Sequence, residues 1–86
     1  MAPYVLLLNG NHYSILLDKA APGSEAHIAL LGATPPTMGR NYVLICSEKA
    51  VEQLMDLRAL YSRDAVLEIT RQFQRQKTRS QQLERN

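Results

Sequence analysis

The sequence predicts an α+β fold, with a small, mainly antiparallel sheet of about four strands in residues 4–46 followed by one or two C-terminal helices in residues 48–80. Two observations predict this fold. Short apolar runs fill the first half of the chain, and Gly, Pro and Asn separate them, as is typical of strands joined by turns. After Ser47, apolar residues instead recur three or four positions apart, which is the spacing of one face of a helix.

The first expected element is a β-hairpin with strands at residues 4–8 and 12–17. The Asn-Gly-Asn segment between them favours a tight turn, because Asn and Gly tolerate the positive φ angles of such turns. Whichever two residues form the turn, Val5, Leu7 and Leu16 share one face of the hairpin. The opposite face is also apolar, so both faces of the hairpin need cover.

Two more strands are expected at residues 27–33 and 41–47, which are short and apolar, the second being rich in β-branched and aromatic side chains. A Pro-Gly turn precedes the first of them. Pro35 and Pro36 forbid a helix between the two. Because neighbouring positions are apolar in both runs, these strands are expected to be buried on both faces.

Two helices are expected in the second half of the chain. Ser47 is a good N-cap for the first, which should end near Tyr61. Residues 62–64, Ser-Arg-Asp, can cap the second. Because no Gly or Pro separates the two, one continuous helix over residues 48–80 is the alternative. The second helix carries a narrow apolar stripe made by Val66, Ile69 and Phe73.

The length of 86 residues allows a single α+β domain, which we expect to span residues 1–75. Residues 76–86 form a polar, basic tail in which Leu83 is the only large apolar residue, and we expect this tail to be solvated or disordered. Residues 1–68 hold five basic and seven acidic side chains, whereas residues 69–86 hold five basic and one acidic. Such asymmetry is typical of a C-terminal segment that contacts an anionic partner.

The composition, 45% hydrophobic and 21% charged, is that of an ordinary soluble protein. The one cysteine, Cys46, cannot form an intrachain disulfide, and this favours a reducing, cytoplasmic setting. The apolar N-terminal run meets the Asn-Gly-Asn segment after five strand-like residues, too soon for a signal peptide or a membrane span. We therefore expect a cytoplasmic protein without a membrane partner.

No catalytic, cofactor-binding or metal site is expected. The chain lacks phosphate-binding loops, paired cysteine ligands and the motifs H-E-x-x-H and G-x-S-x-G. His12 and His27 have no second ligand at a useful spacing, and Cys46, although it precedes a helix N-terminus, has no evident base. We expect structural roles for all three, and neither an enzyme, a cofactor nor a small-molecule substrate.

The loop over residues 32–41 is a candidate for binding. It combines two rigid prolines with two flexible glycines and carries Met38 and Arg40 in exposed-looking positions. Loops of this kind often hold binding residues on a stiff scaffold. The simpler interpretation is a plain connection between two strands.

A basic stripe is expected on the second helix. Arg71, Arg75 and Arg79 stand four residues apart and share one helical face, with Lys77 to the side. Such a stripe is a candidate surface for nucleic acid or for an acidic protein partner. The simpler interpretation is that these cations complement the dipole at the helix C-terminus.

One family resemblance covers 33 of the 86 residues, from 41 to 73. A strand, the helix "SEKAVEQLMDLRALY" and a helix that opens with "SRDAVLEITRQF" follow one another there. This order resembles that of the ribbon-helix-helix DNA-binding repressors, whose second helix often opens with a Ser-Arg pair. The strand of that family exposes polar residues that read base edges, whereas "YVLIC" offers none, and the usual Gly-containing turn between the helices is missing. No functional residue is therefore carried over.

Two tandem helices can cover only one face of a four-stranded sheet, and a second copy of the chain is the simplest cover for the other, because symmetric dimers are the commonest assembly. Val5, Leu7 and Leu16 are the candidate dimer interface. The sequence therefore predicts a small non-catalytic binding or regulatory module, a homodimer that acts through protein–protein contacts with itself and with another protein. The main alternative is a nucleic-acid-binding regulator that uses the basic C-terminal helix. A more remote alternative is an enzyme with its site near Cys46 and the loop at 33–40.

Overall fold

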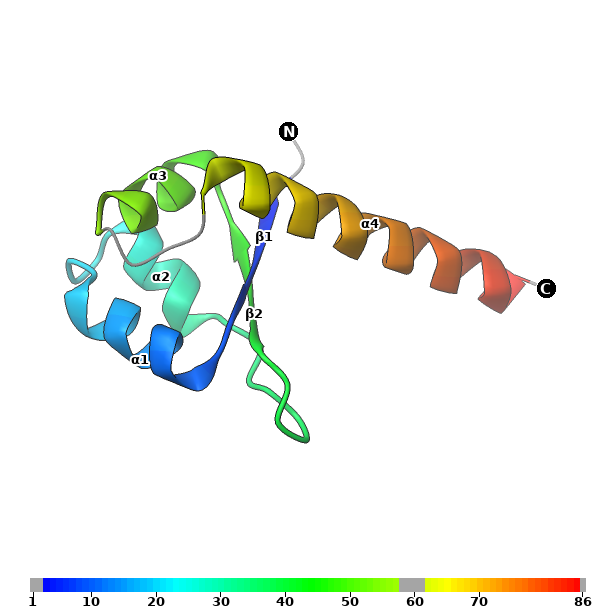
Figure 1. Ribbon diagram of the computed structural model, residues 1–86, viewed down its shortest axis with the longest axis horizontal. Coiled ribbons are helices and arrows are strands. Elements are labelled where there is room, and N and C mark those ends of the chain that lie inside the picture. Colours follow the sequence, from blue (N-terminus) through cyan, green and yellow to red (C-terminus); the bar gives the residue numbers. More distant parts are fainter. Residues whose placement is uncertain (1–2, 58–61, 86) are drawn as a thin grey trace.

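A two-stranded antiparallel sheet lies at the centre of the protein, with helices on both sides of it (Figure 1). The structure is a computed structural model that describes residues 3–57 and 62–85, of which 77–85 are described by their backbone alone. In chain order the elements are β1 (Tyr4–Leu8), α1 (Gly10–Lys19), α2 (Glu25–Leu31), β2 (Tyr42–Cys46), α3 (Glu48–Asp56) and α4 (Arg63–Arg85). The predicted α+β class is confirmed, although the predicted number of strands is not.

The sheet presents one face to the core and the other to α4 and solvent. β1 and β2 pair with Tyr4 opposite Cys46 and Leu8 opposite Tyr42. Because side chains alternate along a strand, the two members of each pair share a face. The inner face carries Tyr4, Leu6, Leu8, Tyr42, Leu44 and Cys46, and the outer face carries Val5, Leu7, Val43 and Ile45.

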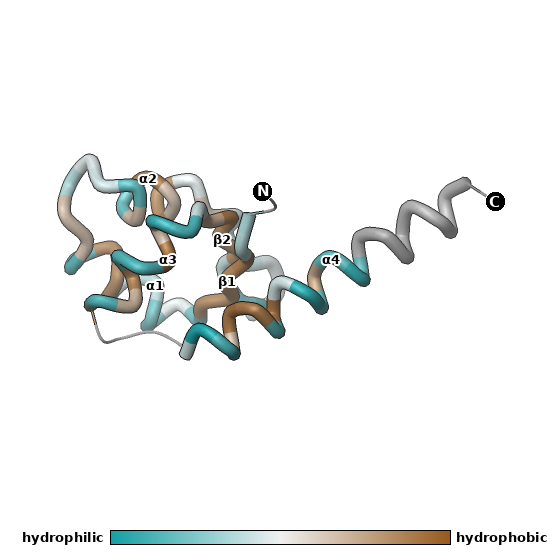
Figure 2. Tube along the Cα trace, turned by 90° about the horizontal axis from the view of Figure 1, so that it is seen from above, coloured by the Kyte–Doolittle hydropathy of each residue, from teal (hydrophilic) through white to brown (hydrophobic). Residues whose placement is uncertain are grey.

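The core lies between the inner face and the helices α1–α3, which gather on that side of the sheet (Figure 2). Leu6 and Leu44 at the centre of the sheet are fully buried. One leucine from each of the three helices is buried beside them, namely Leu16, Leu30 and Leu54. Full burial of such a side chain contributes about 1.5–3 kcal/mol, so this side of the sheet supplies a large share of the folding free energy.

The predicted β-hairpin is wrong, because residues 10–19 form α1. The Asn9 side chain caps this helix by accepting a hydrogen bond from the His12 N–H (2.8 Å). Asn is favoured both in tight turns and at helix N-caps, so the Asn-Gly-Asn segment does not decide between the two. A helical spacing of i, i+3, i+4 and i+7 is present in the residues that pack at the core, Tyr13, Leu16, Leu17 and Ala20.

The strand predicted at 27–33 is also wrong, because α2 occupies its place. Ser24 ends the preceding turn and caps the helix, since its hydroxyl accepts a hydrogen bond from the His27 N–H (3.1 Å). Ala26 and Leu30, four positions apart, are buried against the core. With both runs helical, the described chain keeps only the first and the last of the four predicted strands.

Two separate helices follow β2, so the alternative of one continuous helix is wrong. The Ser47 hydroxyl caps α3 by accepting a hydrogen bond from the Ala50 N–H (3.1 Å), as predicted. Ser62 does the same for α4, accepting from the Ala65 N–H (3.2 Å). The predicted end of the first helix near Tyr61 falls outside the described residues.

α4 runs away from the body of the protein toward the C-terminus (Figure 1). Its first turns lie against β1, where Val66 is fully buried and Thr70 is 7% exposed. The segment predicted as a polar tail, residues 76–86, belongs to this helix as far as Arg85, and its side chains beyond Gln76 lie outside the described part of the structure. None of the helices in the described ranges is both long and apolar enough to cross a membrane.

Candidate functional site

α4 covers only part of the outer face of the sheet. Val5, on the strand next to α4, is 2% exposed, whereas Ile45, on the neighbouring strand, is 53% exposed. Leu7 and Val43 lie between these extremes and are partly buried. The described chain therefore keeps an apolar surface beside α4.

A groove of about 500 Å³ lies between α4 and the loop that precedes β2. Its apolar lining comes mainly from the two strands and α4, and consists of Leu7, Val43, Ile69 and Phe73 with Pro35 and Pro36. Its polar lining consists of Thr34, Thr37, Arg40, Asn41, Gln72 and Gln76. Arg40 is the one charged side chain among the described residues that line it, so the groove is apolar with a basic group at its border.

The loop before β2 is a hairpin arm, residues 34–43, rather than a loose connection. At its base, Thr34 and Val43 exchange two backbone hydrogen bonds of 2.9 and 3.1 Å. Near its tip, the Arg40 N–H donates a hydrogen bond to the Thr37 C=O (3.3 Å). These bonds hold the arm beside the groove.

Met38 stands at the tip of the hairpin arm and is 100% exposed. Its φ angle is 55°, and that of the following residue, Gly39, is 79°. Two successive positive φ angles are typical of a primed β-turn, which favours Gly, Asn or Asp at its first central position. Holding an ordinary residue in this conformation costs about 1–2 kcal/mol. The arm thus presents a large apolar side chain from a strained position, and both predicted loop residues, Met38 and Arg40, are exposed.

A smaller hollow of about 290 Å³ lies where β2 meets α2 and α3, and we call it the α2 hollow. It is lined by Glu25, Ile28, Ala29, Ile45, Ser47 and Ala50. Ile28 is 59% exposed. Beside it, a Glu25 carboxylate oxygen accepts a hydrogen bond from the Ser47 hydroxyl (3.3 Å), and the other lies 3.9 Å from the Lys49 ammonium. The hollow is therefore apolar with an acidic group at its border.

The outer face of β2 joins the groove to the α2 hollow. Val43 lines the groove, Ile45 lines the hollow, and the two are neighbours on one face of the strand. We call the resulting surface the apolar band, made of Phe73, Ile69, Leu7, Val43, Ile45 and Ile28. Single exposed apolar residues are normal on proteins, whereas a large contiguous patch of them is a candidate contact site.

The residues predicted as a dimer interface do not lie together at the surface. Val5 is 2% exposed beside α4, and Leu16 is fully buried in the core as part of α1. Of the three, Leu7 alone is partly exposed, and it lines the groove. The reasoning behind the prediction also changes, because helices lie on both sides of the sheet and leave uncovered only a part of one face. Dimerisation itself stays a prediction.

The predicted basic stripe falls on α4, where Arg71 and Arg75 are exposed. Lys77 and Arg79 belong to the same helix, but their side chains lie outside the described part of the structure. The first turn of α4 carries Asp64. An acid near the N-terminus and bases toward the C-terminus complement the helix dipole, so the arrangement fits this simpler role as well as a phosphate-contact surface.

Cys46 lies on the inner face at 1% exposure, and burial raises the pKa of its thiol to about 12. A reactive thiol needs the opposite shift. His27 Nδ1 accepts a hydrogen bond from the Gly23 N–H (3.4 Å) in the turn before α2, and His12 lies in the first turn of α1. Within residues 3–57 and 62–85, no group of three or more His, Cys, Asp or Glu side chains could hold a metal ion.

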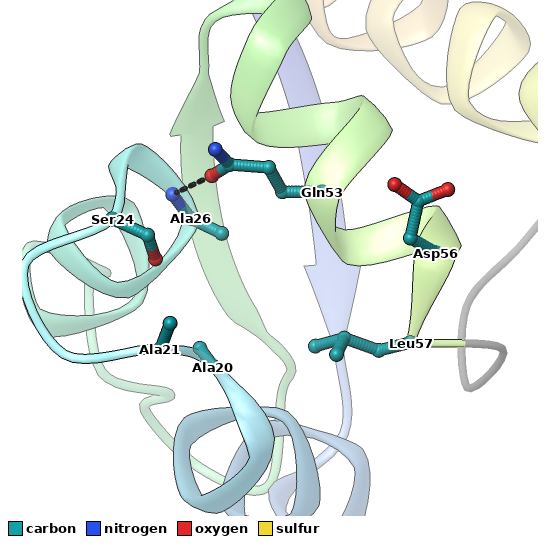
Figure 3. Close-up of a pocket in the computed structure, with 7 residues that line it drawn as sticks. All are labelled: Ala20, Ala21, Ser24, Ala26, Gln53, Asp56 and Leu57. Carbon is teal, nitrogen blue, oxygen red and sulfur yellow. Dashed lines mark hydrogen bonds between the residues drawn. The ribbon is translucent and has the colours of Figure 1, made fainter.

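A third hollow, of about 200 Å³, opens between the turn after α1 and the end of α3 (Figure 3). Its polar lining comes from Ser24, Gln53 and Asp56. Gln53 Oε1 accepts a hydrogen bond from the Ala26 N–H (3.0 Å), and Ser24 Oγ accepts one from the His27 N–H (3.1 Å). Both side chains thus satisfy amide groups at the start of α2, so this hollow is explained by helix capping.

Comparison of the chain with protein-family models, with curated proteins and with solved structures found no match. The apolar band is the strongest candidate for a functional site on structural grounds. Sequence reasoning singled out Leu7, Met38 and Arg40 around it, but missed Ile28 and Ile45. No local signal marks these two, because their exposure depends on α2 being a helix and on α4 lying beside β1.

Proposed function

We propose that this protein is a small non-catalytic binding module that acts through protein–protein contacts on the apolar band. The observation that carries the proposal is the continuity of partly exposed apolar side chains from Phe73 and Ile69, across the strands, to Ile45 and Ile28. Covering apolar surface stabilises a complex by about 25 cal/mol per Å², before the cost of association. A surface of this kind is therefore suited to a protein partner.

The hairpin arm supports the proposal. Met38 is fully exposed at a positive φ angle, although Gly, Asn or Asp would fit this backbone better. Strained residues that persist in a fold often serve its function, because the surrounding structure has to hold them in place. Methionine is well suited to a contact surface, since its flexible thioether adapts to the shape of a partner.

The chemistry of the surface supports a role without catalysis. The polar residues that line the groove are Thr, Asn, Gln and one Arg, and none of these is a residue type that commonly serves as a general acid or base. General acid–base catalysis needs a group whose pKa lies near the operating pH. The Cys46 thiol, with a pKa of about 12, is also unsuited to act as a nucleophile.

The proposal requires that the apolar band, rather than exposed apolar residues in general, holds the partner. Ile15 on α1 is a matched control, because it is 46% exposed, against 53% for Ile45, and lies outside the band. Tagged chains with Ile45→Glu or Ile15→Glu are isolated from cells after brief chemical crosslinking, and the crosslinked proteins, further copies of the chain included, are quantified. Ile45→Glu should lose most of the crosslinked partner, and Ile15→Glu should keep it. Equal retention by the two variants would overturn the proposal.

A second candidate function is binding to nucleic acid along α4. It is favoured by Arg71 and Arg75, which are both exposed and lie one turn apart on the helix that extends away from the body (Figure 1). Contacts with phosphates make binding fall steeply as salt rises. Binding to duplex DNA that weakens with salt and is lost on removal of residues 74–86 would support this candidate. Absence of binding at low salt would exclude it.

A further inference from the structure

We infer that the partner on the apolar band is a second copy of this chain, placed by a twofold axis that crosses the middle of the band. The inference rests on the proposed function, since it names the occupant of the same surface. Three features of the described residues select this occupant. They are the charges at the two ends of the band, the hairpin arm beside one end, and the α2 hollow at the other.

The two ends of the band carry opposite charges. Arg40 lines the groove at one end, and Glu25 lines the α2 hollow at the other. A twofold axis between them reverses the second copy, so that each Arg40 comes to face the Glu25 of the other copy. Associating surfaces bring opposite potentials together, and the apolar band is complementary to itself in this sense.

The same charges disfavour other occupants. An acidic peptide or a phosphate backbone would be attracted to Arg40 but repelled by Glu25, and a basic peptide would meet the reverse. Lys49, whose ammonium lies 3.9 Å from the Glu25 carboxylate and whose side chain is 72% exposed, offsets part of the Glu25 charge. Exposed pairs of this kind are weak, so the Glu25 carboxylate stays available to a second copy.

The shapes of the two ends also correspond. Met38 is fully exposed on the arm at the groove end, and the α2 hollow at the other end has a volume of about 290 Å³ with Ile28 and Ile45 in its lining. Reversal of the second copy brings the arm of one copy toward the hollow of the other. Because a twofold interface repeats every contact, Met38 would anchor the dimer at two places.

A charge exchange between the two ends tests the inference. Arg40→Glu places two acids at each end contact of a homodimer, and Glu25→Lys places two bases there. Each variant alone should raise the dissociation constant of the dimer by about tenfold or more. Mixed in equal amounts, the two variants restore opposite charges at both contacts and should form a heterodimer. Light scattering and sedimentation velocity at micromolar concentration measure all three states.

A control variant and a second test variant complete the experiment. Arg71→Glu makes the same charge change as Arg40→Glu at an exposed position outside the band, and should leave the dimer intact. Met38→Ala should weaken the dimer while leaving the helical circular dichroism unchanged, because Met38 is fully exposed in the single chain.

A wild-type chain that stays monomeric at micromolar concentration would overturn the inference. So would a dimer that is indifferent to both charge reversals, or a mixture of the two variants that stays monomeric. A monomeric chain that is crosslinked to a different protein, and loses it with Ile45→Glu, would refute self-association and leave the proposed function standing. A monomeric chain whose crosslinking is insensitive to Ile45→Glu would refute both.

Discussion

The Thr70 hydroxyl of α4 lies at the edge of β1 and contacts the backbone of Val5, where a third strand would otherwise pair. It accepts a hydrogen bond from the Val5 N–H (2.8 Å), lies 3.4 Å from the Val5 C=O, and donates to the Val66 C=O at 2.9 Å. Edge strands with unpaired backbone groups invite pairing with other chains. By covering β1 at this point, α4 protects this edge from pairing with another chain.

Thr70→Val should destabilise the fold, because it keeps the shape of the side chain but leaves the buried Val5 N–H without its acceptor. Such a loss costs about 1–3 kcal/mol. Urea unfolding followed by circular dichroism measures it. Thr70→Ser keeps the hydroxyl and should lose less, so an equal loss in the two variants would show that the hydrogen bond contributes nothing.

Met38→Gly should stabilise the single chain while it weakens association. Gly adopts a φ angle of 55° without the steric cost that Met bears there, and the net gain should be about 0.5 kcal/mol after the larger chain entropy of Gly is subtracted. Thr37→Gly, in the same arm, relieves no positive φ angle and should destabilise. Urea unfolding of dilute protein separates folding from association. A fall in stability with Met38→Gly would contradict the strain at the tip.

Cys46 should be inert toward thiol reagents in the folded protein at pH 8. Burial holds the pKa of the thiol at about 12, so almost none of the reactive thiolate is present, and the side chain is 1% exposed. Labelling should therefore proceed only as fast as the chain opens, and become rapid in denaturant. Rapid labelling without denaturant would mean that β2 is far more accessible than the structure shows.

The stability of the fold should fall as pH rises from about 9 toward 12. The ordinary pKa of the thiol is 9.0 and the folded value is about 12. Between these values the unfolded chain has released the proton and the folded chain has kept it, so the free energy of unfolding decreases with pH. Below pH 9 the thiol is protonated in both states and has no effect. Cys46→Ala should remove this part of the alkaline slope, and identical slopes in the two proteins would contradict it.

Removal of residues 77–86 should change the melting temperature little. Leu83 is the only large apolar residue in this segment, and ends without buried apolar contacts contribute little to global stability. Differential scanning calorimetry of the truncated chain measures the effect. A loss of several degrees would show instead that Leu83 docks on the body or on a second copy.

The second half of the fold could be predicted from the sequence because several local signals agree there. Ser47 and Ser62 are N-caps, the apolar spacing after each is helical, and the run at 41–47 is rich in β-branched residues. The first half could not, because its short apolar runs fit a strand or a buried helix equally well by periodicity alone. Packing of Leu16 and Leu30 against the inner face decides in favour of helices.

Apart from Leu7, the candidate site was predictable only in its loop. Pro, Gly and exposed-looking residues mark Met38 and Arg40 as accessible without knowledge of the fold. The exposure of Ile45 has no such signal, since the alternating pattern of β2 is apolar on both faces and α4 covers only the β1 side of the outer face. Long-range packing decides which part of the sheet stays uncovered.

The central claim is that the apolar band binds protein, and photo-crosslinking tests it most directly. A photo-crosslinking amino acid is placed at Ile45 in one chain and at Ile15 in another. The two positions have similar exposure, 53% and 46%, and only the first lies on the band. Irradiation in cells that make the protein should yield a protein adduct from Ile45, with a second copy of the chain as its main component, and little or none from Ile15. No adduct from Ile45, or the same adducts from both positions, would contradict a binding role for the band.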